Sequence, residues 1–357
     1  MAGMRTWAAV GGVVVVALSI AIAMRFFPPQ DRKSSSASTT GDAVGAAGSR
    51  DTKQQGDAFA QSRTGPAATR ASMAKSTAPL PPLDAPLAAI VRELKPRAEA
   101  GDARALCRLA VEYRYCAELE GRMQMIETGV ARAQQSPESG RRRGWGSPER
   151  MASAFEETNR LYQHCEGVET PSSTEIVRYM RESALGGHPQ AASYYASGDM
   201  FSSSDTLDNL SELSLYRDNA ESIALAAVAQ GDLRAAWELA QAYASNPEDR
   251  RRPLLAQAVD PQPATALSLL YALRTSIGSA GAAGGVDIQS LLPRVQERIA
   301  SLEQRLPSAD VARARSQPAK IGSDAGAGIP GAGALQRLSG AISSRGRGGD
   351  WARDICD

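Results

Sequence analysis

Few residues of this chain could carry out chemistry, since it has two histidines and four cysteines in 357 residues. One cluster of metal-ligating residue types occurs in the segment HCEGVE, and it consists of His164, Cys165, Glu166 and Glu169. Because no second pair of ligands at the spacing of a zinc site occurs elsewhere in the sequence, we expect no metal and no cofactor. The other histidine, His188, precedes a proline and is expected at the start of a helix, in a capping or solvated position.

Glu156 and Glu157 are a candidate carboxylate pair for cleaving a glycosidic bond of the cell wall. Adjacent residues on a helix point about 100° apart, so these two carboxyl groups would not face each other across a substrate. The sequence also lacks the motifs of serine hydrolases, of phosphate-binding loops and of zinc peptidases. We therefore expect a protein without catalytic activity. The alternative is a peptidoglycan enzyme, or an accessory factor that regulates one.

The formal net charge is only +1, so no overall field attracts nucleic acid, and we expect no nucleic-acid partner. Basic residues gather in two short runs, one of which includes a tryptophan that could stack on a partner. Short charged runs in loops are commonly solvated, but weak contact with an anionic partner such as the cell wall would occur here first. These runs contain Arg141, Arg142, Arg143, Trp145, Arg250, Arg251 and Arg252.

Residues 6–24 carry no charge and are mostly apolar. A helix rises by about 1.5 Å per residue, so a helix over these residues would be close in length to the ~30 Å thickness of a bilayer core. A cleaved signal peptide is the alternative, because Ala21, Ile22 and Ala23 form a small-x-small cleavage site. The stretch is longer than the apolar part of most signal peptides, which favours an uncleaved signal anchor. Residues 34–86 are too poor in apolar side chains to fold, and we expect a disordered linker.

Two opposing features indicate the side of the membrane on which the rest of the chain lies. Arg25, Arg32 and Lys33 follow the apolar stretch, which favours the cytoplasm under the positive-inside rule. The even number of cysteines in a chain with an export signal, together with the long linker, favours the other side. We place the body in the periplasm, anchored in a bacterial inner membrane. It would be periplasmic or secreted without an anchor if the N-terminal segment is cleaved.

The cysteine pairing can be narrowed from the expected helices. Cys116 closes one core-facing helix and Cys165 closes another, so a disulfide between them is the expected pairing. Cys107 cannot pair with Cys116 inside one helix, because the nine residues between them correspond to about 13 Å. Cys356 is either free or paired with Cys107, and buried free thiols are the alternative to any disulfide.

The body, residues 87–306, reads as helical throughout and contains one stretch in two versions. AEAGDARALCRLAVEY (residues 98–113) reappears as VAQGDLRAAWELAQAY (residues 228–243). In each, a glycine ends one helix, an aspartate caps the next, and alanine, leucine and tyrosine follow on one helical face. The matching positions are Gly101 with Gly231, Asp102 with Asp232, Ala105 with Ala235, Leu109 with Leu239, Ala110 with Ala240 and Tyr113 with Tyr243.

A weaker third copy, GGHPQAASYYASGD, places Gly187 and Ala191 in the positions of Gly101 and Ala105. Gly187 lies 44 residues before Gly231 and 86 residues after Gly101, which is about twice that spacing. This regularity predicts an all-α fold of antiparallel helix pairs, each of which cannot bury its apolar face alone.

The pattern resembles that of the Sel1-like repeat proteins, relatives of the tetratricopeptide class. The first helix of that family reads G-x-x-x-A-x-x-x-L-A-x-x-Y, which occurs at residues 101–113 and 231–243. The second helix matches at residues 175–187 and 220–231, but the family's G-x-G-V loop is missing, so the repeats are degenerate. The resemblance implies an α/α solenoid that acts as a protein-interaction scaffold on its concave face, in many members within the cell envelope.

Three segments depart from the repeat pattern. Residues 117–174 are either a worn repeat or an inserted hairpin of two helices. The apolar stripe between Ile288 and Leu306 is typical of a helix with one polar face, which we expect to close the array. Beyond it, residues 307–357 return to low complexity and are expected to form a disordered tail.

Overall fold

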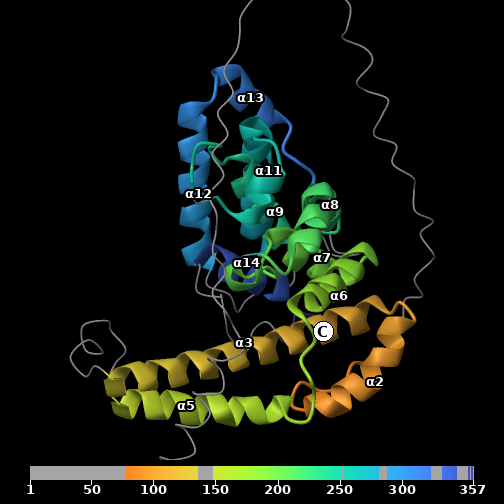
Figure 1. The fold of residues 1–357 in the computed structure, drawn as a ribbon. Coiled ribbons are helices and arrows are strands. Elements are labelled where there is room, and N and C mark those ends of the chain that lie inside the picture. The colour runs from red at the N-terminus through yellow and green to blue at the C-terminus, as the bar shows by residue number, and fades with distance from the viewer. Residues whose placement is uncertain are drawn as a thin grey trace, which may run out of the picture. The chain divides into compact units, whose positions relative to one another are not determined.

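The computed structural model describes the protein over residues 78–135, 148–250, 252–280, 288–322 and 332–343, and at Arg353, Ile355 and Cys356. Regular structure in these residues is entirely helical, so the prediction of an all-α fold is confirmed (Figure 1). The expected anchor, 6–24, and most of the expected linker, 34–86, lie outside the described residues. None of the helices in the described part has both the length and the apolar character needed to span a membrane.

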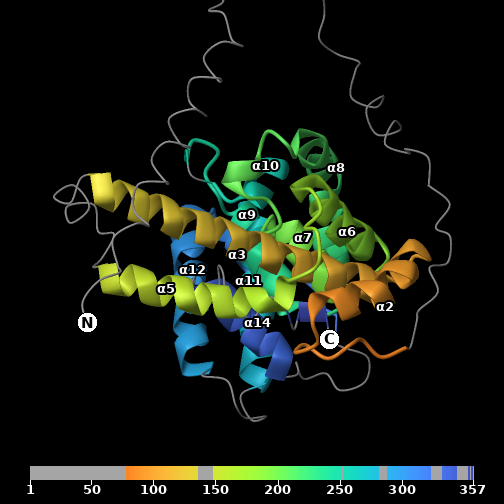
Figure 2. The same ribbon diagram turned by 60° about the horizontal axis from the view of Figure 1, so that its bottom comes forward.

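A long helical hairpin begins the body. The helix α3 (Ala103–Gln135) packs on α2 (Leu87–Glu99) and on α5 (Pro148–Tyr162), which runs back along it (Figure 1, Figure 2). The 3-10 helix η1 (Gln163–Cys165) follows α5 directly. Residues 117–174 thus contribute the second half of α3 and the whole of α5, a packed helix pair that agrees with either a worn repeat or an inserted hairpin.

The helix α3 is longer than the sequence indicated, because Cys116 does not end it. It continues without interruption to Gln135 and spans 33 residues. No proline follows Cys116 in this stretch, and a single glycine such as Gly121 costs only about 1 kcal/mol inside a helix. Leu119, beyond the expected end, is buried and so extends the packed face of α3.

The rest of the body consists of helices that each pack on the next. Contacts join α3 to α6, α6 to α7, α7 to α8, α8 to α9, α9 to α11 and α11 to α12, and also α7 to α9 and α6 to α8. Helices that are close in the sequence therefore pack on each other throughout this part of the body. The elements are α6 (Ser173–Leu185), α7 (Pro189–Ser197), η2 (Ser203–Asp205), α8 (Leu210–Ala229), α9 (Leu233–Tyr243), α10 (Leu254–Ala258), α11 (Pro263–Ala280) and α12 (Ile288–Arg305).

The turns that lead into α3, α7 and α9 share one local structure. Each contains a glycine in the left-handed region, where a side chain would be strained, and these are Gly101 (φ 85°), Gly187 (φ 85°) and Gly231 (φ 94°). The next side chain accepts a hydrogen bond from the first turn of the new helix: Asp102 from Ala105 N, His188 from Ala191 N, and Asp232 from Ala235 N. The repeat positions that follow are all buried, namely Ala105, Leu109, Ala110, Tyr113, Ala191, Ala235, Leu239, Ala240 and Tyr243.

The expectation of a disordered tail over 307–357 is wrong for the parts of the tail that the structure describes. The helix α13 (Ser308–Ser316) packs on α11, and α14 (Ala332–Ser343) packs on α9 and α12. The low-complexity composition concealed three large apolar residues at helical spacing, which are Leu335, Leu338 and Ile342, and all three are buried. The helix α12 buries its apolar stripe at Leu291, Val295, Ile299 and Leu302, but it is not the last helix on the array.

Residues 317–322 connect α13 back to the middle of the array. Gly322 N donates a hydrogen bond to Val228 O at 3.0 Å, which fixes this segment on the last turn of α8. The approach is so close that a Cβ on residue 322 would lie 1.9 Å from Ala229 O. Only glycine can occupy this position without a shift of the backbone.

We expect Gly322→Ala to lower the free energy of unfolding by roughly 1–3 kcal/mol, because the added methyl group overpacks the contact with α8. Urea denaturation followed by circular dichroism measures this loss. Gly121→Ala is the control, since a Cβ there meets nothing within 4 Å and should raise helix stability by up to about 1 kcal/mol. Equal losses for the two variants would show that the contact at Gly322 is not tight.

Candidate functional site

The first helix of each repeat is enclosed along its length. No residue is exposed in 101–117, 188–200 or 231–245, which contain the start of α3, all of α7 and all of α9. Part of this enclosure comes from the C-terminal end of the chain, which contacts α9, α3 and the residue that caps α7.

We call α14 together with Arg353, Ile355 and Cys356 the C-terminal cover. Its helix lies against α9 and α12 (Figure 1), and Arg294 of α12 donates a hydrogen bond to Ile342 O at 2.9 Å. Leu335, Leu338 and Ile342 point into this contact, with at most 5% of each side chain exposed. The cover thus begins as a short amphipathic helix seated on two helices of the array.

The far end of the cover lies on α3 and on the start of α7. Cys356 forms a disulfide with Cys107 of α3, with an S–S distance of 2.02 Å and a Cα–Cα distance of 5.7 Å. The ring of His188, which caps α7, makes a hydrogen bond to the backbone of Cys356. Ile355 and Cys356 are both buried. Of the two alternatives for Cys356, the structure therefore contains the pair with Cys107.

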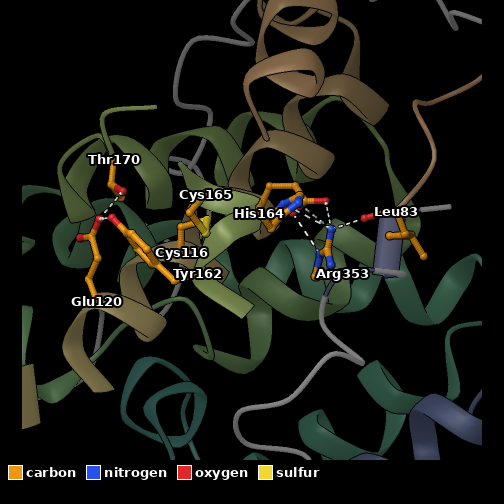
Figure 3. Close-up of a disulfide and its surroundings, with 9 residues drawn as sticks. Leu83, Cys116, Glu120, Tyr162, His164, Cys165, Thr170 and Arg353 are labelled. Carbon is orange, nitrogen blue, oxygen red and sulfur yellow. Dashed lines mark hydrogen bonds and ion pairs between the residues drawn. A yellow bond between two sulfur atoms is a disulfide. The ribbon is translucent and has the colours of Figure 1, made fainter. Parts of the chain in front are cut away.

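A buried cluster of charges lies on α3 between Cys107 and Cys116, and Figure 3 shows two of its members, His164 and Arg353, near the Cys116–Cys165 disulfide. The Glu112 carboxylate forms an ion pair with Arg108 at 2.8 Å. It also accepts hydrogen bonds from Arg353 Nε at 3.1 Å and from His164 Nε2 at 2.9 Å. The Arg108 and Glu112 side chains are fully buried, and those of Arg353 and His164 are 15% and 11% exposed. One carboxylate on α3 therefore holds the C-terminal cover and η1 at the same place.

Further contacts of Arg353 extend the cluster to the start of the body. Its guanidinium donates to the carbonyl of Leu83, which precedes α2, and lies 5.1 Å from the centre of the Tyr115 ring. Its own carbonyl accepts from Arg108 Nη1 at 3.2 Å. Burial by itself would raise the pKa of Glu112, but the hydrogen bond from His164 and the charges of Arg108 and Arg353 outweigh burial and lower it. Glu112 is therefore ionised at neutral pH.

The second disulfide joins Cys116 and Cys165, as expected from the sequence, with an S–S distance of 1.97 Å. It fixes η1 on α3 and so brings His164 to Glu112 (Figure 3). The candidate metal ligands of HCEGVE do not come together at one site. Cys165 is in a disulfide, and the side chains of Glu166 and Glu169 are exposed. Among the described residues, no group of three or more His, Cys, Asp or Glu side chains is arranged to hold a metal ion.

The other candidate residues do not gather at this site. Arg141, Arg142, Arg143, Trp145 and Arg251 lie outside the described residues. Arg250 is exposed, and Arg252 donates to Ala256 O of α10 at 2.9 Å, a contact within its own chain. Glu156 and Glu157 are exposed on the solvent side of α5.

Arg108, Glu112 and Arg353 were missed by the sequence analysis. Arg108 and Glu112 stand four residues apart within a stretch whose other positions are apolar, and this pattern was a usable signal for a buried ion pair. Arg353 gives no such signal, because it reaches Glu112 across 241 residues.

Comparisons of the chain with protein-family models, with curated proteins and with solved structures found no match. The function is therefore argued from the residues of this chain alone.

We expect Glu112→Gln to lower the free energy of unfolding by roughly 3–5 kcal/mol, because it removes the buried negative charge that balances the two arginines. Glu118→Gln is a matched control on the same helix. Arg114 and Glu118 have the same spacing and the same 2.8 Å distance as Arg108 and Glu112, but they are partly exposed. The control should lose less than about 0.5 kcal/mol in the same urea titration. A comparable loss for both would mean that burial of the pair is unimportant.

His188 predicts a dependence of stability on pH. Burial lowers the pKa of its ring to about 4, from 6.5 in the unfolded chain, so the unfolded chain binds more protons between these values. Stability is thus complete above about pH 6.5 and falls by up to roughly 3 kcal/mol as the pH drops towards 4. Protonation of Nδ1 also removes the lone pair that accepts the capping hydrogen bond from Ala191 N.

His188→Asn keeps a capping group without a titratable ring, and we expect it to abolish this part of the pH dependence. Unfolding measured in urea at several pH values between 4 and 7 compares the two chains. Glu112 contributes a separate loss of stability, because its pKa is lowered in the folded chain. That loss begins only as the pH falls below the unfolded pKa of 4.5, and it occurs equally in the wild-type and His188→Asn chains. Parallel pH profiles for the two chains would rule out His188 as the source.

Proposed function

We propose that this protein is a membrane-anchored scaffold of the cell envelope, whose helical body binds other proteins without catalysing a reaction. The observation that carries this proposal is the seat of α14. A short helix with apolar residues at positions 335, 338 and 342 is bound on α9 and α12, so this surface has the shape and apolar character to accept an amphipathic helix.

Membership of the Sel1-like repeat class is part of the proposal. It is supported by three helix starts with the same glycine turn, the same side-chain cap and the same buried small residues. The neighbour-to-neighbour packing of α6 to α12 is what an α/α solenoid requires. The hairpin of α3 and α5 and the C-terminal cover are additions to that pattern.

The periplasmic location is also proposed, and the cysteines support it. All four are in disulfides, with none left as a free thiol. Disulfides form and persist in oxidising compartments such as the periplasm and are rare in the cytosol. This agrees with the expected membrane anchor at 6–24 and a body on the outer side of that membrane.

Photocrosslinking in whole cells tests the scaffold proposal. A photoreactive amino acid in place of Gln296, which is exposed on α12, one of the two helices that form the seat, should form a defined adduct with another protein. The chain also carries Cys107→Ser and Cys356→Ser, so that α14 can leave the seat. The same amino acid in place of Glu156, which is exposed on α5 away from that seat, is the control and should give none.

Identical adducts from both positions, or no adduct from either, would overturn the proposal that the α14 seat is a binding surface. The enzyme alternative has its own readout. Release of soluble fragments from purified peptidoglycan by the wild-type chain, lost in Glu156→Gln or Glu157→Gln, would replace the scaffold by a cell-wall enzyme.

A further inference from the structure

We propose that the C-terminal cover is an intramolecular occupant of the partner-binding surface and that the Cys107–Cys356 disulfide locks it there. The oxidised chain is closed to other proteins, and the chain with this bond open accepts a partner helix in place of α14. This inference rests on the proposed scaffold function and adds to it a means of regulation.

The first argument is the path of the cover over the array. Its helix lies on α9 and α12, and its last residues lie on α3 and at the start of α7. The two described ends of the cover thus contact the first helices of different repeats.

The two ends of the cover are held by contacts of different strength. The helix α14 has twelve residues and is held mainly by three large apolar side chains. A helix of this length is marginal by itself in water, so it stays bound only where tertiary contacts and a high local concentration favour it. The far end supplies that concentration through a covalent bond.

Three contacts hold the C-terminal end of the cover, and residues of α3 make all three; we call these contacts the tie. Cys107 holds Cys356 covalently, Glu112 holds Arg353 through a buried ion pair, and Arg108 donates to the Arg353 carbonyl. These contacts fix where the cover ends but touch none of the apolar seat of α14. Opening the tie leaves α14 tethered on one side only, through the segment that ends at Gly322, so a partner helix can compete for the seat, which itself stays intact.

Opening proceeds by exchange with a dithiol reductant. One thiolate of the reductant attacks a sulfur of the Cys107–Cys356 bond and forms a mixed disulfide, which releases the other cysteine as a thiol. The second thiol of the reductant then closes its own disulfide and releases the second cysteine. The reductant loses two electrons, and the protein gains two electrons and two protons as two thiols.

The occupant that replaces α14 is an amphipathic helix of another protein, with large aliphatic residues at the spacing of Leu335, Leu338 and Ile342. The seat itself supports this choice, because its natural occupant has that pattern. Charged side chains of the replacing helix would face solvent, as Gln336 of α14 does.

Binding of a labelled peptide with the sequence of residues 332–343, AGALQRLSGAIS, tests the lock. Fluorescence anisotropy is measured with the full chain in detergent. The oxidised wild-type chain should not bind the peptide measurably. A chain with Cys107→Ser and Cys356→Ser, in which only the tie is open, should bind it at least about tenfold more tightly.

The other disulfide provides the matched control. Cys116→Ser with Cys165→Ser removes a bond from the same helix that does not hold the cover, and this chain should behave as wild type. A peptide carrying Asp in place of the leucine at position 338 should bind none of the chains. Equal binding to the closed and opened chains, or no binding to an opened chain that is folded by circular dichroism, would overturn the proposal.

Hydrogen exchange before and after treatment with a dithiol covers the case in which the opened variant does not fold. Reduction should raise exchange in α14 while α6 to α9 stay protected. Loss of protection throughout the body would show that the disulfide stabilises the whole fold, which would contradict the proposal that it only locks α14 in place. Peptide binding by the opened chain without any cellular adduct at Gln296 would instead contradict the scaffold function and leave the intramolecular contact standing.

Discussion

A buried carboxylate is the constraint on which the rest of this structure depends. Glu112 has no exposed surface, and a charge in that position is tolerated only if partners surround it. Those partners come from α3 itself, from η1 and from the C-terminal cover. The two disulfides lie on either side of Glu112 along α3, so each holds one of the incoming segments where the carboxylate needs it.

The repeats and the cover depend on each other through side-chain size. Alanines at the repeat positions let neighbouring helices approach closely, which gives a continuous core but leaves each first helix with a flat, small-residue surface. Such a surface binds a further helix readily. In this protein the chain supplies that helix itself, and the proposed scaffold function and its proposed regulation both depend on this one arrangement.

Local rules were enough to predict part of the structure from the sequence. The glycine turns, the caps at Asp102 and Asp232 and the buried positions of the repeats depend on residues within a few positions of each other. The Cys116–Cys165 pair followed from the expected helix ends, although α3 does not in fact end there. The length of α3 was missed because its second half is stabilised by α5, which the repeat pattern does not contain.

The cover was missed for a different reason. Low complexity and scattered glycines normally indicate too little apolar surface to fold, and residues 307–357 satisfy that description as a whole. Three apolar side chains suffice for α14 only because an existing surface receives them. Neither that surface nor the contact of Arg353 with Glu112 can be deduced from neighbours in the sequence.

The Cys107–Cys356 bond also changes how the array can come apart. Stacked repeats ordinarily fray, since a terminal repeat has a neighbour on one side only and unfolding can spread inwards from it. Here the bond joins positions 249 residues apart, and Arg353 contacts Leu83 at the start of the body. The helices between Cys107 and Cys356 are thus closed into one covalent loop. Their melting is thereby coupled into a single cooperative event.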